Sequence, residues 1–376
     1  MSAIGALSRK IGQGTYNKCI LTPEGHVLRI SKAGNCDVVR GAMITRLFQG
    51  HSVSLGPSLV REVRNGEMRG KRAFVQALEY LQGGSFPHAC TSAEAVALPL
   101  LWFLCSARTR FNFTHGDFKC ENIVFRNYGQ DCEFLFQLHA HGVYRVRAHQ
   151  VPVIIDFDYA SVAQTHDKTA VGTQYTQPPE ILASRFLWHI EALNSDQVAA
   201  EHDDWWSLGM TLYKWWTVGR NSFRMPDSSY EAYVQSIFDT YLLSRDDESV
   251  CNGDWGLIAL RNMFRAYCIV KQLGGDISSV TPGCVFFSGE RRVFLEQGAR
   301  QWRRENPVHF SNFQVKLLRR LLSWNPADRS YGGNAWKLIT EHFEPVATFC
   351  KPDYCCTPQK EEEDAFIPLK LLKDIE

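Results

Sequence analysis

The sequence contains no long hydrophobic run. The apolar stretch at residues 96–105 has ten residues and includes a proline, so it is too short to span a bilayer. No long apolar segment follows a basic flank near the first residue, and we therefore expect no secretory signal. These absences predict a cytoplasmic protein without membrane insertion, and they leave access to the nucleus open.

The chain also lacks an excess of charge of either sign. It has 41 Lys and Arg residues against 40 Asp and Glu residues, so no strong overall field favours nucleic acid or an anionic membrane as a partner. We expect no nucleic-acid partner, and any other partner has to be inferred from local sites.

Zinc-type cysteine spacing is absent, although the chain has 12 cysteines. No Cys-x-x-Cys pair occurs, and no histidine cluster of the zinc-binding kind stands beside a cysteine. The cysteines are therefore predicted to be mostly buried thiols in a reducing compartment.

What is present is the composition of a folded, enzyme-sized protein. The chain has 376 residues, of which 45% are hydrophobic, and this is ample for a core. The length allows two lobes, or one lobe with a large insertion.

One short stretch, with an acidic turn after it, carries the pattern that points to chemistry. Asp117 is followed by Lys119 and Asn122 and then by an apolar strand, and Asp156 ends a second apolar strand. In a phosphoryl-transfer site, Asp117 would accept the proton of the attacking hydroxyl and Lys119 would neutralise charge on the moving phosphoryl group. Asn122 and Asp156 would hold Mg²⁺. The alternative is that Asp117 and Asn122 only cap a turn.

These residues resemble two motifs of the protein kinases, the catalytic loop His-Arg-Asp-Leu-Lys-x-x-Asn and the metal-binding turn Asp-Phe-Gly. The chain has His-Gly-Asp-Phe-Lys-Cys-Glu-Asn and Asp-Phe-Asp at the corresponding places. The resemblance implies ATP and Mg²⁺ as cofactors. It also implies that Asp117, Lys119 and Asn122 are catalytic and that Asn122 and Asp156 bind the metal.

The first residues extend the resemblance. Gly12 and Gly14 stand between two strand-like segments, as in the kinase glycine-rich loop, and paired glycines let backbone amides approach a phosphate closely. The next strand, residues 26–32, would supply the cation that grips the phosphates. Arg29 in its middle and Lys32 at its end are both candidates. We favour Arg29, because glycine and asparagine break the strand just after Lys32.

Glu79 and Leu81 fall where kinases have the hinge between their lobes. The resemblance implies that the backbone of these two residues hydrogen-bonds an adenine edge. An ordinary strand that ends in a Gly-Gly linker is the equally compatible alternative. The hinge places the lobe boundary near Gly83.

The chain departs from the kinase pattern in three places. The helix expected between Val38 and Gly50 contains no glutamate that could pair with the phosphate-gripping cation. Asp158 stands where protein kinases have glycine, and it is either a second metal ligand or a turn-capping residue. Gly116 replaces the arginine that receives a phosphorylated activation loop, so we do not expect control by loop phosphorylation.

Three later stretches distinguish protein kinases from small-molecule kinases, which generally lack them. Residues 172–180 resemble the end of the activation segment, and residues 204–209 resemble the start of the central helix of the large lobe. Residues 317–329 resemble the helix whose arginine pairs with the activation-segment glutamate. The resemblance therefore implies an ion pair between Glu180 and Arg329. It also implies contact between Thr173 and the catalytic aspartate.

The implied fold is α+β and two-lobed. Residues 1–83 would form an N-lobe built on a small antiparallel β-sheet, and residues 84–345 would form a mainly helical C-lobe. Residues 346–376 would form an acidic tail. Two insertions are expected in the C-lobe, at residues 126–150 and at about 230–310.

The first insertion contains His139, His141 and His149, which we interpret as solvated loop histidines rather than metal ligands. The second contains helix-like segments, and we interpret it as decoration of the lobe rather than as a platform for a partner.

The favoured function is that of a serine/threonine protein kinase, which transfers the γ-phosphoryl group of Mg·ATP to a hydroxyl on a protein substrate. Lys119 favours serine or threonine, because tyrosine kinases usually lack a lysine at that place. One alternative is a small-molecule kinase of the aminoglycoside or choline type, suggested by His-Gly-Asp and Asp-Phe-Asp. The other is a weak or inactive pseudokinase scaffold, suggested by the missing helix glutamate.

Overall fold

The structure is a computed structural model that describes most of the chain. The described residues are 9–13, 17–32, 36–48, 59–64, 72–87, 91–138, 142–162, 172–187, 203–217, 223–241, 254–277, 284–287, 289–331 and 333–347. They belong to two compact units. The first combines residues 1–115, 120–165 and 345–376, and the second combines residues 116–119 and 166–344. These units differ from the division at residues 83 and 345 that the sequence predicts, and that division remains a prediction.

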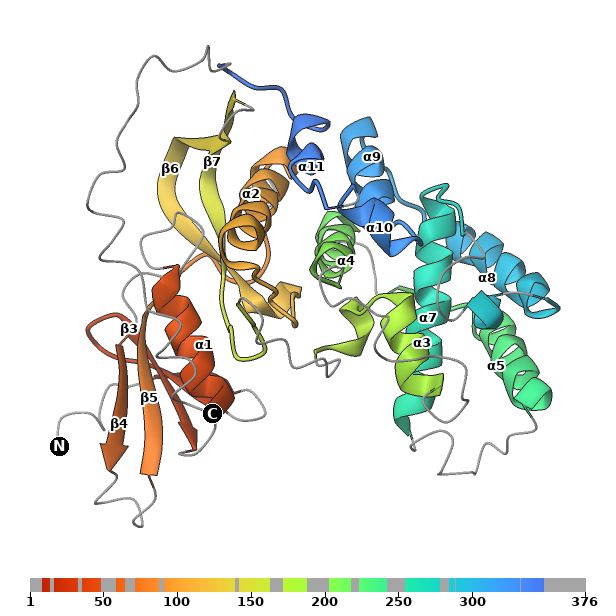
Figure 1. Ribbon diagram of the computed structural model, residues 1–376, viewed down its shortest axis with the longest axis horizontal. Coiled ribbons are helices and arrows are strands. Elements are labelled where there is room, and N and C mark those ends of the chain that lie inside the picture. The colour runs from red at the N-terminus through yellow and green to blue at the C-terminus, as the bar shows by residue number, and fades with distance from the viewer. Residues whose placement is uncertain are drawn as a thin grey trace. The chain divides into compact units, whose positions relative to one another are not determined.

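The first unit contains a five-stranded antiparallel sheet with the strand order β1-β2-β3-β5-β4 (Figure 1). The strands are β1 (Arg9–Gln13), β2 (Asn17–Leu21), β3 (His26–Lys32), β4 (Leu59–Arg64) and β5 (Arg72–Glu79). The small antiparallel sheet and the strand expected at residues 26–32 are confirmed, and β4 is a further strand of the sheet.

Helix α1 (Cys36–Leu47) packs against β4 and β5 of this sheet. Val38, Ala42 and Ile44 of this helix are buried in the core. Phe48 follows the last turn and is also buried.

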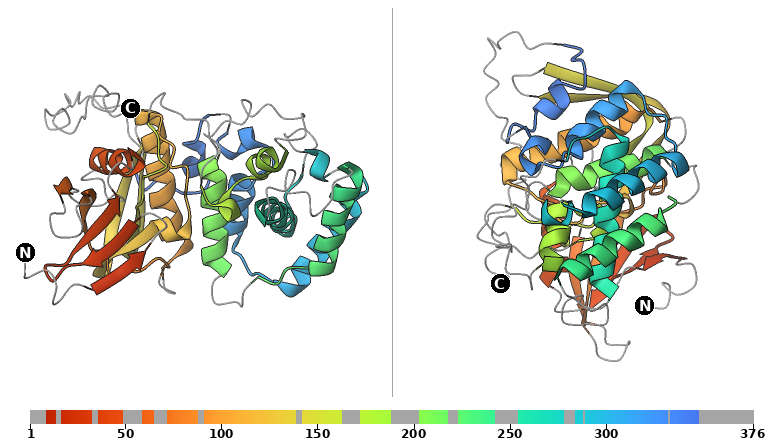
Figure 2. Two further views of the ribbon diagram at one scale, coloured as in Figure 1. Left: turned by 90° about the horizontal axis from the view of Figure 1, so that it is seen from below. Right: turned by 90° about the vertical axis from the view of Figure 1, so that its right-hand side faces the viewer.

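Helix α2 (Ala93–Phe111) and a long hairpin complete the first unit. The Ser92 side chain caps the helix by accepting a hydrogen bond from the Ala95 N–H at 3.1 Å. The hairpin strands, β6 (Ile123–Leu138) and β7 (Gly142–Ile154), pair antiparallel, and β7 packs on α2 (Figures 1 and 2).

The hairpin accounts for the first predicted insertion and corrects one interpretation. His149 lies within strand β7 rather than in a loop, 3.8 Å from the Asp131 carboxylate. Its side chain is partly exposed and lies on the more exposed face of β7, in the same alternate set as Arg145 and Arg147. His139 and His141 lie outside the described residues.

The second unit is helical. The described helices are α3 (Pro179–Leu187), α4 (Asp203–Thr217), α5 (Asp227–Tyr241), α7 (Asp254–Gln272), α8 (Arg291–Glu305), α9 (Asn312–Leu321), α10 (Pro326–Arg329) and α11 (Lys337–Thr340), with short 3₁₀ turns at Gln174–Thr176 and Cys284–Phe287. Helix α7 contacts α3, α5 and α8, and α4 contacts α9. The described part of the second predicted insertion therefore consists mainly of helices that belong to this unit.

None of the helices in the described ranges is long and apolar enough to cross a membrane. The acidic stretch of the predicted tail, around residues 361–364, lies outside those ranges.

Candidate functional site

In the first unit, Asn122 and Asp156 are held next to each other by the base of the hairpin. Asn122 ends the 3₁₀ turn Cys120–Asn122, directly before β6, and Asp156 follows β7 by two residues. The Ile155 N–H donates to the Asn122 carbonyl oxygen at 2.9 Å, which continues the strand pairing to the residue before Asp156. Asp156 itself has a positive φ of 63°, a backbone conformation that is uncommon for a residue other than glycine.

The turn after Asp156 is anchored by Phe157. Its ring is buried against Phe48, Phe113 and His115, at centroid distances of 5.8, 6.0 and 5.4 Å. His115 is also tied to the strand, because its Nε2 lies 3.2 Å from the Ile155 carbonyl oxygen. Because Phe157 is fixed in the core, the carboxylates of Asp156 and Asp158 on either side of it both contact one cation.

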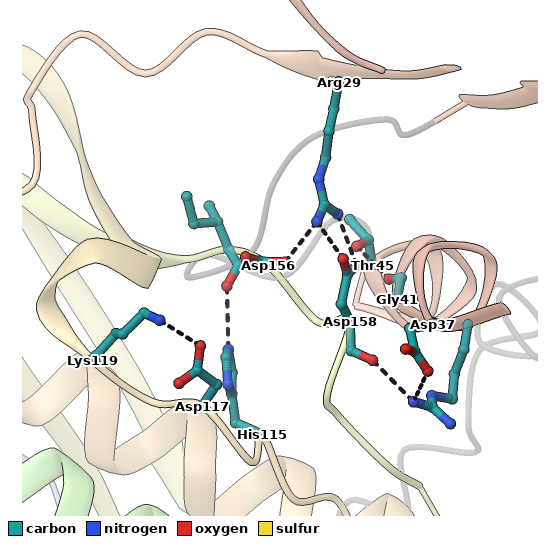
Figure 3. Close-up of polar contacts among 11 residues, drawn as sticks. Arg29, Asp37, Gly41, Thr45, His115, Asp117, Lys119, Asp156 and Asp158 are labelled. Carbon is teal, nitrogen blue, oxygen red and sulfur yellow. Dashed lines mark hydrogen bonds and ion pairs between the residues drawn. The ribbon is translucent and has the colours of Figure 1, made fainter. Parts of the chain in front are cut away.

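That cation is Arg29, from the middle of β3 (Figure 3). Its guanidinium donates to both oxygens of Asp158, from Nη1 to Oδ1 at 2.9 Å and from Nη2 to Oδ2 at 2.5 Å. Nη2 also donates to Asp156 Oδ1 at 2.8 Å. The contact with Asp158 is therefore a two-point pair, and the contact with Asp156 is a single bond that shares one nitrogen.

The two carboxylates stabilise the charge of Arg29. Burial by itself would lower the pKa of the Arg29 guanidinium, but the charges of Asp156 and Asp158 outweigh it and raise the pKa above its ordinary value. Arg29 thus stays protonated beside the two carboxylates.

In the second unit, Asp117 is the centre of a closed hydrogen-bond network. Its Oδ1 accepts from both the backbone N–H and the hydroxyl of Thr173, each at 2.8 Å, and its Oδ2 accepts from Lys119 Nζ at 2.6 Å. Lys119 Nζ also donates to the Thr173 hydroxyl oxygen at 2.7 Å. Asp117 is only 6% exposed. The predicted contact between Thr173 and Asp117 is confirmed.

Two glycines and Asp204 hold this network in place. The Gly116 N–H donates to Asp204 Oδ1, at the start of α4, at 3.1 Å. Gly172 has a φ of +111°, and a Cβ placed on it would lie 2.4 Å from the Gly116 carbonyl oxygen. Only glycine fits there, because a side chain would collide with backbone. Gly116, which stands where the kinase pattern has an arginine, is therefore the point at which the segment before Asp117 contacts the segment before Thr173.

The structure describes the other predicted site residues to different extents. Gly12 lies in β1, where it pairs with Cys19 of β2, and Gly14 lies outside the described residues. Lys32 ends β3 opposite Ala73, and its side chain is not among those described.

Glu79 and Leu81 lie beside the base of the hairpin. Glu79 forms a two-point pair with Arg126 of β6, with nitrogen to oxygen distances of 2.8 and 3.3 Å. Leu81 is buried in an apolar cluster with Val153, against which Leu78, Val124 and Ile155 also pack. The chain then pairs with β6, because the Gly83 N–H donates to the Phe125 carbonyl oxygen at 2.9 Å. Leu78, Val124 and Ile155 are only partly buried, so part of this apolar cluster is exposed.

A magnesium ion would find suitable ligands in the first unit. No group of three or more His, Cys, Asp or Glu side chains in the described part of the chain is arranged to hold a metal. Mg²⁺ needs no such cage, because it commonly binds through one or two carboxylates together with substrate phosphates and water. Asn122 and Asp156 offer the amide and carboxylate oxygens that this ion prefers.

The sequence did not predict that Arg29 pairs with Asp158 or that Asp204 accepts a hydrogen bond from Gly116. The sequence shows Asp158 as an extra acid two residues after Asp156, a spacing that places both carboxylates on one side of the turn. That spacing was the available signal. The approach of β3 to this turn, 129 residues later in the chain, has no local signal.

Comparison with known proteins gives a likeness in structure alone. No protein-family model matches the sequence, and no curated protein matches it. Among solved structures, the crystal structure of a Plasmodium kinase domain is similar, with a TM-score of 0.50 and 12% sequence identity. The similarity covers 88% of this chain and 93% of that one. The chain therefore has a mixed α+β fold like that of a kinase domain.

Proposed function

We propose that this protein is an ATP-dependent phosphotransferase that transfers the γ-phosphoryl group of ATP to a serine or threonine hydroxyl on a protein. The observation that carries the proposal is the network around Asp117, in which a buried carboxylate is held by Lys119 and Thr173. The kinase-like fold supports it.

The reaction assigns a role to each residue of that network. The substrate hydroxyl oxygen forms a bond to the γ-phosphorus, the bond from that phosphorus to the ADP oxygen breaks, and the hydroxyl proton passes to Asp117. Lys119 stabilises the negative charge on the phosphoryl oxygens during transfer. Thr173 orients Asp117 through two hydrogen bonds, so that the carboxylate need not reorganise during the reaction.

The nucleotide and the metal are assigned to the first unit. The apolar cluster around Leu81 would take the adenine, and Arg29 would bind phosphate oxygens. Asn122 and Asp156 would hold Mg²⁺, which when bound neutralises charge on the phosphates. The acceptor hydroxyl is assigned to Asp117 of the second unit.

Lys119 supports serine and threonine as acceptors, as the sequence resemblance implies. A second candidate is a nucleotide-binding protein with little turnover. It is favoured by one observation, the hydrogen bond from Arg29 to Asp156, which occupies an oxygen of a proposed metal ligand.

The test is transfer of labelled γ-phosphate from Mg·ATP to a generic basic protein, to the protein itself, and to aminoglycoside and choline acceptors. Wild type is compared with Asp117→Asn and Asp156→Asn, and with Asp131→Asn as a matched control. Asp131 is an exposed acid of the hairpin, so its loss should leave transfer unchanged. We expect label on serine or threonine that both site variants abolish.

Each other result points to a different function. Label on the small molecules alone would indicate a metabolite kinase. Nucleotide binding by a folded wild-type protein that transfers no label would favour the second candidate.

A further inference from the structure

We propose that Asp158 positions Arg29 for the nucleotide phosphates, in place of the helix glutamate that this chain lacks. The inference rests on the proposed function and adds a positioning residue to its site. It gives Asp158 a third role, because the sequence left open only a metal ligand or a turn cap.

The geometry of the pair supports this role. Asp158 is 8% exposed and engages both terminal nitrogens of Arg29, which fixes the plane of the guanidinium as well as its position. A carboxylate whose two oxygens already accept from an arginine is poorly placed to bind a metal ion. The contact of the same arginine with Asp156 is a single hydrogen bond, from Nη2 to Oδ1.

Helix α1 provides no carboxylate for Arg29 and leaves space for Asp158. Among its residues the only acid is Asp37, whose half-exposed carboxylate pairs with Arg40 at 2.7 Å. Gly41 faces the turn so closely that a Cβ placed on it would lie 2.5 Å from Asp158 Oδ1 and 2.8 Å from the Asp158 backbone nitrogen. A glutamate at that position would not fit, and the glycine admits the aspartate instead.

Helix α1 also binds the backbone of Asp158. Arg40 Nη2 donates to the Asp158 carbonyl oxygen at 3.1 Å, so α1 holds the backbone of the turn while Arg29 of the sheet holds the Asp158 side chain. In phosphoryl-transfer sites of this kind, an ion pair between a sheet cation and a helix carboxylate keeps the cation extended toward the phosphates. Here the acid has moved from the helix to the turn.

Removing Asp158 should release Arg29 onto Asp156. The single bond already present between Arg29 and Asp156 would become the main contact of the guanidinium. That collapse withdraws the cation from the phosphates and covers the metal ligand at the same time. Loss of Asp158 and loss of Arg29 should therefore damage the same step.

The test is a double-mutant cycle with Asp158→Asn, Arg29→Met and the double variant. For each protein, kcat/KM for ATP in the transfer reaction and the equilibrium Kd of Mg·ATP are measured, each across a range of Mg²⁺ concentrations. We expect each single change to weaken both quantities by about 10- to 100-fold, as for other residues that orient a ligand. The double variant should be no worse than the worse single variant, because one residue acts through the other.

The choice of variants guards against misfolding. Arg29→Met removes the arginine that pairs with the buried Asp158 carboxylate, which can destabilise the fold. Circular dichroism therefore has to show that the variant is folded. If it is not folded, Arg29→Lys replaces it in the cycle, since lysine keeps the charge but cannot bind both carboxylate oxygens. Asp131→Asn makes the same chemical change at an exposed site and should leave both quantities unchanged.

The possible outcomes separate this inference from the proposed function. An Asp158→Asn variant with wild-type affinity and turnover overturns the inference alone. The inference is overturned if the losses of the two single variants multiply in the double variant and Asp158→Asn raises the Mg²⁺ requirement even when Arg29 is absent. That result would make Asp158 a metal ligand. A wild-type protein that binds Mg·ATP but transfers no phosphate overturns the transferase function, and the Kd values still decide the inference. A wild-type protein that binds no nucleotide overturns both.

Discussion

Arg329 and Glu180, 149 residues apart in the sequence, form a buried two-point ion pair. Arg329 Nη1 lies 2.5 Å from Glu180 Oε1, and Nη2 lies 3.0 Å from Oε2. The guanidinium also lies over the ring of Trp206, with 4.8 Å between its central carbon and the ring centroid. The pair joins the end of α10 to the first turn of α3, and it confirms the pair implied by the sequence resemblance.

Breaking this pair should destabilise the second unit. Arg329 is fully buried, so Arg329→Met leaves the Glu180 carboxylate buried without its counter-charge. We expect the free energy of unfolding, measured in urea, to fall by about 3 to 5 kcal/mol. The double variant Arg329→Met, Glu180→Leu should recover much of that loss, because it leaves no buried charge. Equal losses in the single and double variants would contradict this account.

The hydroxyl of Thr173 should matter for transfer more than for folding. Thr173→Val keeps the size of the side chain but removes the two hydrogen bonds that the hydroxyl makes with Asp117 and Lys119. The hydrogen bond from the backbone N–H to Asp117 remains. We expect kcat to fall about tenfold or more, since hydrogen bonds to charged groups contribute about 1.5 to 3 kcal/mol. Thr173→Ser keeps the hydroxyl and should retain most of the activity. The prediction fails if the valine and serine variants have the same kcat.

A methyl group at Gly172 should displace Thr173 from Asp117. The added Cβ would lie 2.4 Å from the Gly116 carbonyl oxygen, so Gly172→Ala has to shift the backbone next to Thr173. We expect a loss of transfer activity together with a loss of stability of about 1 to 3 kcal/mol.

Gly333→Ala is the matched control for Gly172→Ala. Gly333 also has a positive φ, of 96°, but a Cβ placed on it meets nothing within 4 Å. The control should therefore carry the backbone strain without the collision, and its activity should equal that of wild type. An active Gly172→Ala variant would show that the segment tolerates a shift.

Stability should decrease in mild acid because of His342. Burial lowers the pKa of this imidazole, whose Nδ1 lies 2.9 Å from the Leu338 carbonyl oxygen. The unfolded chain therefore binds a proton at a higher pH than the folded chain does. Below the unfolded pKa of about 6.5, the free energy of unfolding should fall as the pH falls toward the folded pKa.

The histidine contribution can be isolated by substitution. His342→Asn keeps an N–H donor near the Leu338 carbonyl oxygen but cannot be protonated, so the slope of unfolding free energy against pH between 5 and 7 should decrease. His309→Asn removes an exposed histidine and should leave the slope as it is. An unchanged slope in the His342 variant would assign the acid sensitivity to other groups.

The sequence by itself determined the local elements and the short-range chemistry. The sequence predicted the strand at residues 26–32 and helix-like segments in the second insertion, and the structure has β3 there and helices α7 and α8 within the insertion. The short stretch that contains Asp117 and Lys119 was likewise evident from the sequence. Such features are encoded over a few residues, where backbone geometry leaves few alternatives.

Only the tertiary structure decided the partners that lie far apart in the chain. Arg29 and Asp158 meet because β3 crosses the turn after β7, and Gly41 of α1 provides the space. The extent of the β6–β7 hairpin was likewise not evident, and it placed His149 in a strand. Contacts of this kind depend on how whole elements pack, and packing is decided by the sum of many weak interactions rather than by any local pattern.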